Sequence, residues 1–378
     1  MKELELYIHI PYCVKKCKYC DFLSAPGSAS ERQKYVESLC ERIRSYAEPM
    51  KAYHVVSIFL GGGTPSVLEP EQTGAIFDAV YDAFRVDEDA EITTEMNPGT
   101  VTEQKLSLYR KIGINRLSIG LQSVNNDELK ALGRIHTYED FLDTYQMARR
   151  AGFRNINVDL MSAIPCQSLE SYERGVRMVA ELGPEHISAY SLIIEEGTPF
   201  YDRYGEGKHE EELPDEDTER LMYTRTKEIL ESYGYHRYEI SNYAKDGYEC
   251  RHNLGYWERR EYLGIGAGAA SLIDNMRFCE PENFGKAGAA TDRQPEMQII
   301  DIRGQMEEFM FLGLRKTAGV SGKVFRQSFF VDIENVYGET IKKLIGQRLL
   351  EWEGDCLRLT ERGIDVSNYV MSKFLFVS

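Results

Sequence analysis

The chain has 378 residues, 42% of them hydrophobic and 28% charged, which is the composition of an ordinary soluble globular protein. Its 45 basic and 61 acidic residues give a formal charge of −16, which argues against a nucleic acid partner because phosphate binding requires an excess of Lys and Arg. Only the first three of its eight cysteines are clustered, which argues against a disulfide framework and predicts a cytoplasmic protein with reduced thiols.

The N-terminal region lacks the pattern of a secretory signal. Glu3 and Glu5 interrupt the apolar run that such a signal would need. No segment approaches the roughly 20 apolar residues that span a bilayer. We therefore expect no transmembrane segment, and only a peripheral contact with a membrane stays open.

Six short runs rich in β-branched residues predict strands that alternate with amphipathic helices. The predicted strands cover residues 4–10, 55–60, 91–95, 117–121, 156–160 and 187–193. The predicted helices cover residues 31–47, 71–84, 102–112, 138–151 and 168–181. Strands that alternate with helices form parallel βαβ units. Six such units in succession favour the α/β class and a partial (β/α)6 TIM-like barrel.

Residue types at the helix ends agree with these boundaries. Thr100 and Glu103 have the spacing of a capping box, and Thr137 is placed to cap the helix that follows it. Gly113 and Gly152 come directly after helices, where a left-handed conformation is expected.

Polar or glycine residues come at or just after the end of each predicted strand. They are the cysteine loop, Gly61-Gly62-Gly63-Thr64, Glu95, Gln122, Asp159 and Tyr190-Ser191. Because all strands of a parallel barrel end on one face, these clusters are expected to converge on a single rim. The pattern predicts a functional site there.

The chain divides into three predicted parts. Residues 1–235 form the partial barrel, residues 236–300 an irregular connecting segment, and residues 301–378 a mostly helical C-terminal domain. In the last part, a helix, a short hairpin around Glu353-Gly354-Asp355 and a final helix resemble a winged-helix module. Its mixed charge favours packing or partner recognition over DNA binding.

Cys13, Cys17 and Cys20 lie in one loop with the spacing C-x3-C-x2-C, directly after the first strand. Soft thiolates select iron–sulfur clusters, zinc or Cu(I). A structural zinc site would need a fourth ligand, either His9 on the strand or a distant cysteine. Three thiolates can instead hold three irons of a cubane and leave the fourth iron open to amino and carboxylate groups. Zinc stays the alternative.

The string YIHIPYCVKKCKYCDF resembles the cluster loop of the radical S-adenosylmethionine superfamily. With GGGTPS, EMNPGT, SIGLQS, LGRIHT, NVDLMSAIP and HNLGYW, the chain is similar over nearly its whole length to the oxygen-independent coproporphyrinogen-III-oxidase-like family. The resemblance implies a [4Fe–4S] cluster on the three cysteines, S-adenosylmethionine on the open iron, and reductive cleavage of that cofactor. A flavodoxin or ferredoxin is the kind of reductant it implies.

Candidate cofactor-binding residues follow from the rim and the resemblance. They are Tyr7, Tyr19, Gly62, Gly63, Thr64, Glu95, Gln122, Arg134 and Asp159. Backbone N–H groups of the glycine run can meet a carboxylate or amine, although a tight turn is the alternative. Glu95 can accept hydrogen bonds from ribose hydroxyls or an amino group, and Arg134 can pair with the cofactor carboxylate.

Two branches of the family remain as hypotheses for the function of this chain. The oxidase branch carries a further Cys where this chain has Phe22, and a long N-terminal extension, whereas here the first ligand is residue 13. Both differences favour the haem chaperone branch, which binds haem and passes it to client haem proteins, such as those of respiration. The oxidase, and a haem-binding protein with a structural or sensing cluster, stay the alternatives, and enzymatic activity is left open.

The segment with the signature HNxxYW is the candidate for haem contact. His252 offers an axial-ligand type, and Tyr256 and Trp257 supply aromatic surface for a flat porphyrin. A histidine among aromatic residues is equally often a hydrogen-bonded core residue. The haem assignment is therefore a hypothesis.

Overall fold

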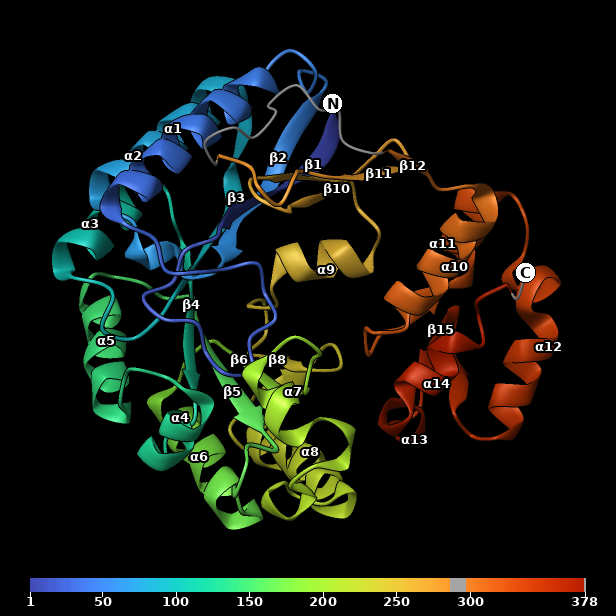
Figure 1. Ribbon diagram of the computed structural model, residues 1–378. Helices are drawn as coiled ribbons and strands as arrows, with labels where there is room; N and C mark the ends of the chain where they lie inside the picture. Colours follow the sequence, from blue (N-terminus) through green and yellow to red (C-terminus); the bar gives the residue numbers. More distant parts are fainter. Residues whose placement is uncertain (286–296, 377–378) are drawn as a thin grey trace.

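Six parallel strands form the centre of a 12-stranded sheet and follow one another in chain order (Figure 1). The computed structural model describes residues 1–285 and 297–376. The strands are β1 (Lys2–Ile10), β2 (Tyr53–Gly62), β3 (Val86–Met96), β4 (Arg116–Gln122), β5 (Ile156–Ser162) and β6 (His186–Ser191). The sheet keeps two edges, so the barrel is partial, which confirms the predicted fold class.

Helices cover the outer face of this curved sheet, as Figure 1 shows. The short helices α4 (Asn126–Leu132) and α7 (Pro199–Tyr204) contact the cysteine loop instead. The outer helices are α1 (Ala29–Ser45), α2 (Pro70–Ala83), α3 (Glu103–Lys111), α5 (Tyr138–Arg150), α6 (Leu169–Leu182) and α8 (Glu216–Ser232). Leu4, Leu6 and Ile8 of β1 are buried in the hydrophobic core that the sheet shares with these helices. Because side chains alternate along a strand, Glu5 and Tyr7 face the opposite, inner side.

The helix starts confirm one predicted cap and correct another. Thr137 accepts a hydrogen bond from the Asp140 backbone and forms a capping box at the start of α5. The cap of α3 is Thr102, not Thr100. Thr100 lies further from the helix start, and its hydroxyl donates to the carbonyl of Asn97 at 2.6 Å.

The segment expected to be irregular contains short regular elements that extend both edges of the sheet. They are β7 (His236–Arg237), β8 (Asn242–Ala244), α9 (Arg251–Trp257), β9 (Tyr262–Ile265), β10 (Ala270–Ile273), β11 (Met276–Cys279) and β12 (Gln298–Ile299). β8 pairs with β6, and β9 pairs with β1. Strands of two to four residues are too short to produce a periodic pattern. Residues 286–296 lie outside the described residues.

The C-terminal domain has its own hydrophobic core. It comprises α10 (Ile302–Gly313), β13 (Val320–Ser321), α11 (Gly322–Phe329), α12 (Ile333–Gly346), β14 (Leu350–Glu353), β15 (Cys356–Leu359), α13 (Glu361–Asp365) and α14 (Ser367–Ser372). The predicted hairpin is present as β14–β15. The domain contacts the α9 region through Arg315, whose guanidinium lies 4.3 Å from the Trp257 ring centroid. The exact division of the chain at residues 235 and 300 stays a prediction.

In the described parts of the chain, every helix is too short or too polar to cross a membrane.

Candidate functional site

A cavity of about 370 Å³ opens inside the curved sheet, at the carboxyl ends of the parallel strands. Its lining includes Cys13, Cys17, Tyr19, Cys20, Gly62, Gly63, Thr64, Glu95, Gln122, Arg134 and Asp159. These residues come from loops and strand ends that are far apart in the sequence. The convergence of the strand-end clusters on one rim is thus observed, and of the predicted cofactor-binding residues only Tyr7 lies outside the lining.

Backbone hydrogen bonds hold the cysteine loop over this cavity. The amide of Cys13 donates to the carbonyl of Ala25 at 3.1 Å. The amide of Lys18 donates to Leu132 at the end of α4, and the amide of Phe200 in α7 donates to Lys18, each at 3.0 Å. The loop is therefore fixed by two helices outside the strand from which it starts.

The donor set of the loop fits a cubane with one open iron. His9, the nearest candidate for a fourth ligand, has both ring nitrogens engaged, with the Tyr7 hydroxyl and the Leu23 carbonyl, each at 2.9 Å. A tetrahedral zinc site would bring its sulfurs to about 3.8 Å from one another. Among the described residues, the cysteine sulfurs form no group of three within 4.8 Å. The three thiols therefore suit a larger cluster better than a single metal ion.

The glycine run packs against the cysteine loop, and its amides are not free, contrary to expectation. Gly62 N–H donates to Glu95 Oε2 at 2.9 Å, and Gly63 N–H donates to the Ile10 carbonyl at 2.9 Å. A Cβ on Gly63 would lie 2.6 Å from the backbone oxygen of Tyr12. The glycines thus serve close packing, and only their carbonyls and Cα atoms are offered to a ligand.

Asn97 connects three parts of the cavity wall through hydrogen bonds. It was not among the predicted site residues. Its Nδ2 donates to Thr64 Oγ1 at 2.8 Å, and its Oδ1 accepts from Arg134 Nη2 at 2.8 Å. Arg134 also reaches the Cys17 sulfur at 3.5 Å and the Gly120 carbonyl. Asn97 could have been predicted from the sequence, because it directly follows β3 in the same strand-end position as the other rim residues.

Two half-buried carboxyl groups, those of Glu95 and Asp159, lie in the cavity wall. Burial, together with the neighbouring Asp159, raises the pKa of Glu95 to about 8, although the Gly62 hydrogen bond opposes this. Burial likewise raises the pKa of Asp159, against hydrogen bonds that include Asn157. A cationic ligand group would favour the ionised form of both side chains. The wall is thus suited to an amino or sulfonium group.

Gln122 adopts a strained backbone conformation at the end of β4. Its φ angle is +76°, in the left-handed region that side chains other than glycine rarely adopt. Its Oε1 accepts a hydrogen bond from the Tyr190 hydroxyl at 2.7 Å, which fixes the side chain at the rim. Such strain concentrates at ligand sites.

The candidate haem residues lie elsewhere. His252 is 1% exposed, and its nitrogens contact Ser57 Oγ at 2.8 Å and the Tyr256 hydroxyl at 3.0 Å. Burial lowers the pKa of His252 to about 3, so the ring is neutral. Tyr256 and Trp257, with Tyr7, line a separate cavity of about 300 Å³. In this structure His252 offers no free nitrogen to an iron.

The floor of the rim cavity consists of residues that were not among the predicted site residues, although some of them lie in the motifs quoted above. They are Arg116, Ser118, Asn157, Ser188, Ser241, Asn242 and Asn253. Arg116 is the one charged residue of β4 (Arg116–Gln122), whose other side chains are neutral. That contrast is the signal that could have found it.

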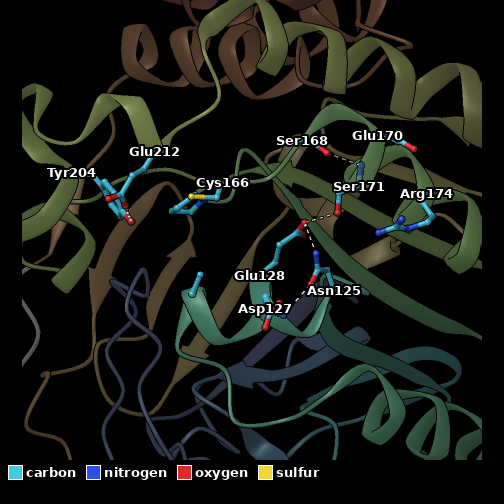
Figure 2. A pocket seen from close by; sticks show the side chains of 12 residues that line it. Asn125, Asp127, Glu128, Cys166, Ser168, Glu170, Ser171, Arg174, Tyr204 and Glu212 are labelled. Carbon is cyan, nitrogen blue, oxygen red and sulfur yellow. Dashed lines mark hydrogen bonds between the residues drawn. The ribbon is translucent and has the colours of Figure 1, made fainter.

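A second cavity, of about 450 Å³, lies between α4 and the start of α6 (Figure 2). At its centre, Glu128 accepts hydrogen bonds from Ser171 and Asn125, as Figure 2 shows, and from Ser123 and Gln167. The carboxylate is therefore satisfied by the protein itself. None of the predicted site residues lines this cavity.

Comparison with known proteins covers the whole chain. A model of the radical SAM superfamily matches residues 7–179, and a model of the HemN C-terminal domain matches residues 303–366. The chain is 36% identical to the heme chaperone HemW of Lactococcus lactis, covering 99% of this chain and 98% of that protein. It is 42% identical to the heme chaperone HemW of Escherichia coli, covering 99% of each.

The solved structure of coproporphyrinogen III oxidase (HemN) from Escherichia coli has the same fold. The TM-score is 0.86, over 99% of this chain and 90% of that one, at 21% identity. At this identity the likeness bears on the fold alone.

Proposed function

The chain belongs to the radical SAM superfamily and, within it, to the family of the heme chaperone HemW, and from this premise we propose that it is a haem chaperone. It binds a [4Fe–4S] cluster, S-adenosylmethionine and haem, and it delivers haem to client haem proteins. The observation that carries the proposal is full-length similarity to proteins of that name. Respiratory haem proteins are the expected clients.

In this proposal the cluster is held by Cys13, Cys17 and Cys20. When bound and reduced, the cluster supplies an electron to S-adenosylmethionine. The cofactor is bound by the rim residues Tyr19, Gly62, Gly63, Thr64, Glu95, Gln122, Arg134 and Asp159. Thr64 and Arg134 contact the sulfurs of Cys13 and Cys17 at 3.4 and 3.5 Å. Hydrogen bonds to a ligating sulfur stabilise its charge.

The protein supplies electrostatic complementarity to the cationic cofactor. Glu95 and Asp159 are half-buried carboxyl groups with raised pKa values, and a sulfonium or amino group would stabilise the ionised form of both. Phe22, in the position where the oxidase branch carries a further cysteine, favours the chaperone over the oxidase.

The test is anaerobic reconstitution of the full chain with iron and sulfide. Wild type should bind about four irons per chain, whereas Cys17→Ser should lose the cluster. Cys166→Ser is the matched control, because Cys166 is exposed and lies outside the loop. The reconstituted protein is then assayed, with dithionite and S-adenosylmethionine, for haem transfer to an apo-protein and for conversion of coproporphyrinogen III.

Haem transfer without conversion of coproporphyrinogen III supports the proposal. Conversion to protoporphyrinogen IX assigns the chain to the oxidase. Failure to bind S-adenosylmethionine and to transfer haem would favour the third hypothesis, in which the cluster has a structural or sensing role. A single bound zinc ion would overturn the cluster itself.

A further inference from the structure

Arg116 is a buried cation without a protein partner. It is 2% exposed, and it projects from the first residue of β4 into the floor of the rim cavity. Among the described residues, none forms a hydrogen bond or an ion pair with its guanidinium, and its Nε is a buried atom without an acceptor. Desolvating a guanidinium without pairing costs several kcal/mol. Such a group is expected where a ligand supplies the missing charge.

The nearest acidic side chains are committed to other contacts. Glu91 accepts hydrogen bonds from the amides of Arg251 and His252 at 3.1 and 3.2 Å, so it caps the start of α9. Asp159 accepts from Asn157 at 2.7 Å and from Ser118 at 3.5 Å. Both carboxylates contribute to the field at Arg116, but neither comes within 4 Å of its guanidinium nitrogens.

The rest of the floor adds neutral hydrogen-bonding groups around this cation. Asn253 projects from α9, and Asn242 from β8, and the Nδ2 group of an asparagine can donate hydrogen bonds to an anion. Ser188 and Ser241 complete the lining. The floor thus combines one unpaired cation with amide and hydroxyl groups, which is the composition of a site for a carboxylate.

This floor lies apart from the rim. Arg116 and Gly120 face the same cavity on the same strand, four residues apart, which corresponds to about 13 Å. Arg134, the cation at the rim, contacts the Gly120 carbonyl. Arg116 and the carbonyl that Arg134 contacts thus lie about 13 Å apart along β4.

We propose that the cavity floor is a carboxylate-binding subsite, in which Arg116 pairs with the ligand and Asn253 and Asn242 flank it. This proposal extends the proposed function. Only the part that concerns haem depends on that function. The carboxylate belongs either to a tetrapyrrole side chain or to a small free acid. In this proposal the subsite is separate from the amino-acid end of S-adenosylmethionine, which the proposed function assigns to the rim.

The first experiment measures thermal unfolding of the reconstituted full chain in chloride and in propionate. Propionate should raise the midpoint of wild type and leave that of Arg116→Met unchanged, because an anion that binds the folded state stabilises it and the variant lacks the binding cation. Arg259→Met is the matched control, because the Arg259 side chain is only 14% exposed but is paired with Glu308 at 2.7 Å. In chloride, Arg259→Met should lower the midpoint, whereas Arg116→Met should not.

The second experiment compares binding of haem with binding of haem dimethyl ester, which lacks both carboxylates. If the ligand is a tetrapyrrole, wild type binds haem about ten-fold more tightly than the ester, and Arg116→Met binds the two equally. If wild type binds both equally while propionate still protects through Arg116, the subsite holds a small free acid.

The subsite is overturned if propionate stabilises Arg116→Met as much as wild type. It is also overturned if Arg116→Met loses as much stability in chloride as Arg259→Met, because that is the behaviour of a structural cation. A wild type that binds neither tetrapyrrole contradicts the haem function, whereas the propionate result decides the subsite independently.

Discussion

The Nδ1 atom of His252 lies 2.8 Å from the hydroxyl of Ser57, so α9 is tied to the inner face of β2. The His252 ring also stacks on Phe59 with a centroid distance of 5.3 Å. The helix that carries the HNLGYW sequence therefore closes the inside of the partial barrel. His252 therefore makes structural contacts within the protein that do not depend on bound haem.

Replacing His252 with Ala should destabilise the protein and leave its haem affinity unchanged. The variant loses a buried ring and leaves Ser57 without its partner, which costs about 2–3 kcal/mol. Urea unfolding gives the stability, and haem titration of the folded fraction gives the affinity. His54→Ala, at a half-buried histidine paired with Asp87, is the control. A loss of haem affinity in a fully folded His252→Ala protein would establish the residue as a ligand.

Replacing Asn97 with Ala should weaken S-adenosylmethionine binding about ten-fold. Without its amide, Thr64 and Arg134 lose the bridge that positions them beside the cysteine sulfurs. Equilibrium dialysis of the reconstituted protein measures the affinity. Asn126→Ala removes an asparagine with hydrogen bonds to Glu139 and Tyr138, away from the cavity, and should leave binding unchanged. Equal affinities for the two variants would contradict the bridging role.

Glu5 should make the stability of the protein fall between mildly acidic and alkaline pH. It is 1% exposed, both carboxylate oxygens lack a partner, and burial raises its pKa to about 8. A folded pKa above the unfolded value of 4.5 means that the folded state holds the proton more tightly. The contribution to stability is therefore complete below about pH 4.5 and is lost as pH rises through about 8.

Glu5→Gln should flatten this pH dependence. It should be close to wild type in stability at pH 5 and more stable at pH 9, as measured by urea unfolding at each pH. Glu3→Gln, on the exposed part of the same strand, is the control and should leave the slope unchanged. A wild-type slope retained in Glu5→Gln would assign the effect to another group, such as Glu95.

Replacing Gly63 with Ala should displace the cysteine loop and reduce cluster occupancy. The new Cβ would lie 2.6 Å from the Tyr12 oxygen and 3.0 Å from the Ile10 oxygen, and neither backbone atom can move without the loop. Iron and sulfide per chain measure the effect. Gly74→Ala in α2 has no atom within 4 Å of the new Cβ and should gain up to about 1 kcal/mol of stability. Full occupancy in Gly63→Ala would show that the loop tolerates the shift.

The order of the six strands and their helices was predictable because it depends on local periodicity and on the rule that alternating strands and helices form parallel units. The rim was predictable for the same reason, since parallel strands present their ends on one face. The chemistry of the cysteine triad followed from spacing and from the preferences of thiolates. These features are properties of short segments.

The tertiary structure alone decided how distant segments use these residues. In the folded chain the amides of Gly62 and Gly63 donate hydrogen bonds to Glu95 and Ile10, and no local sequence pattern specifies these contacts. The position of α9 inside the barrel gives both ring nitrogens of His252 a hydrogen-bond partner. Arg116, at the cavity floor, has no such partner in the described part of the chain. Each of these outcomes depends on the three-dimensional meeting of polar groups, because whether a buried charge is paired depends on its neighbours in space and not in sequence.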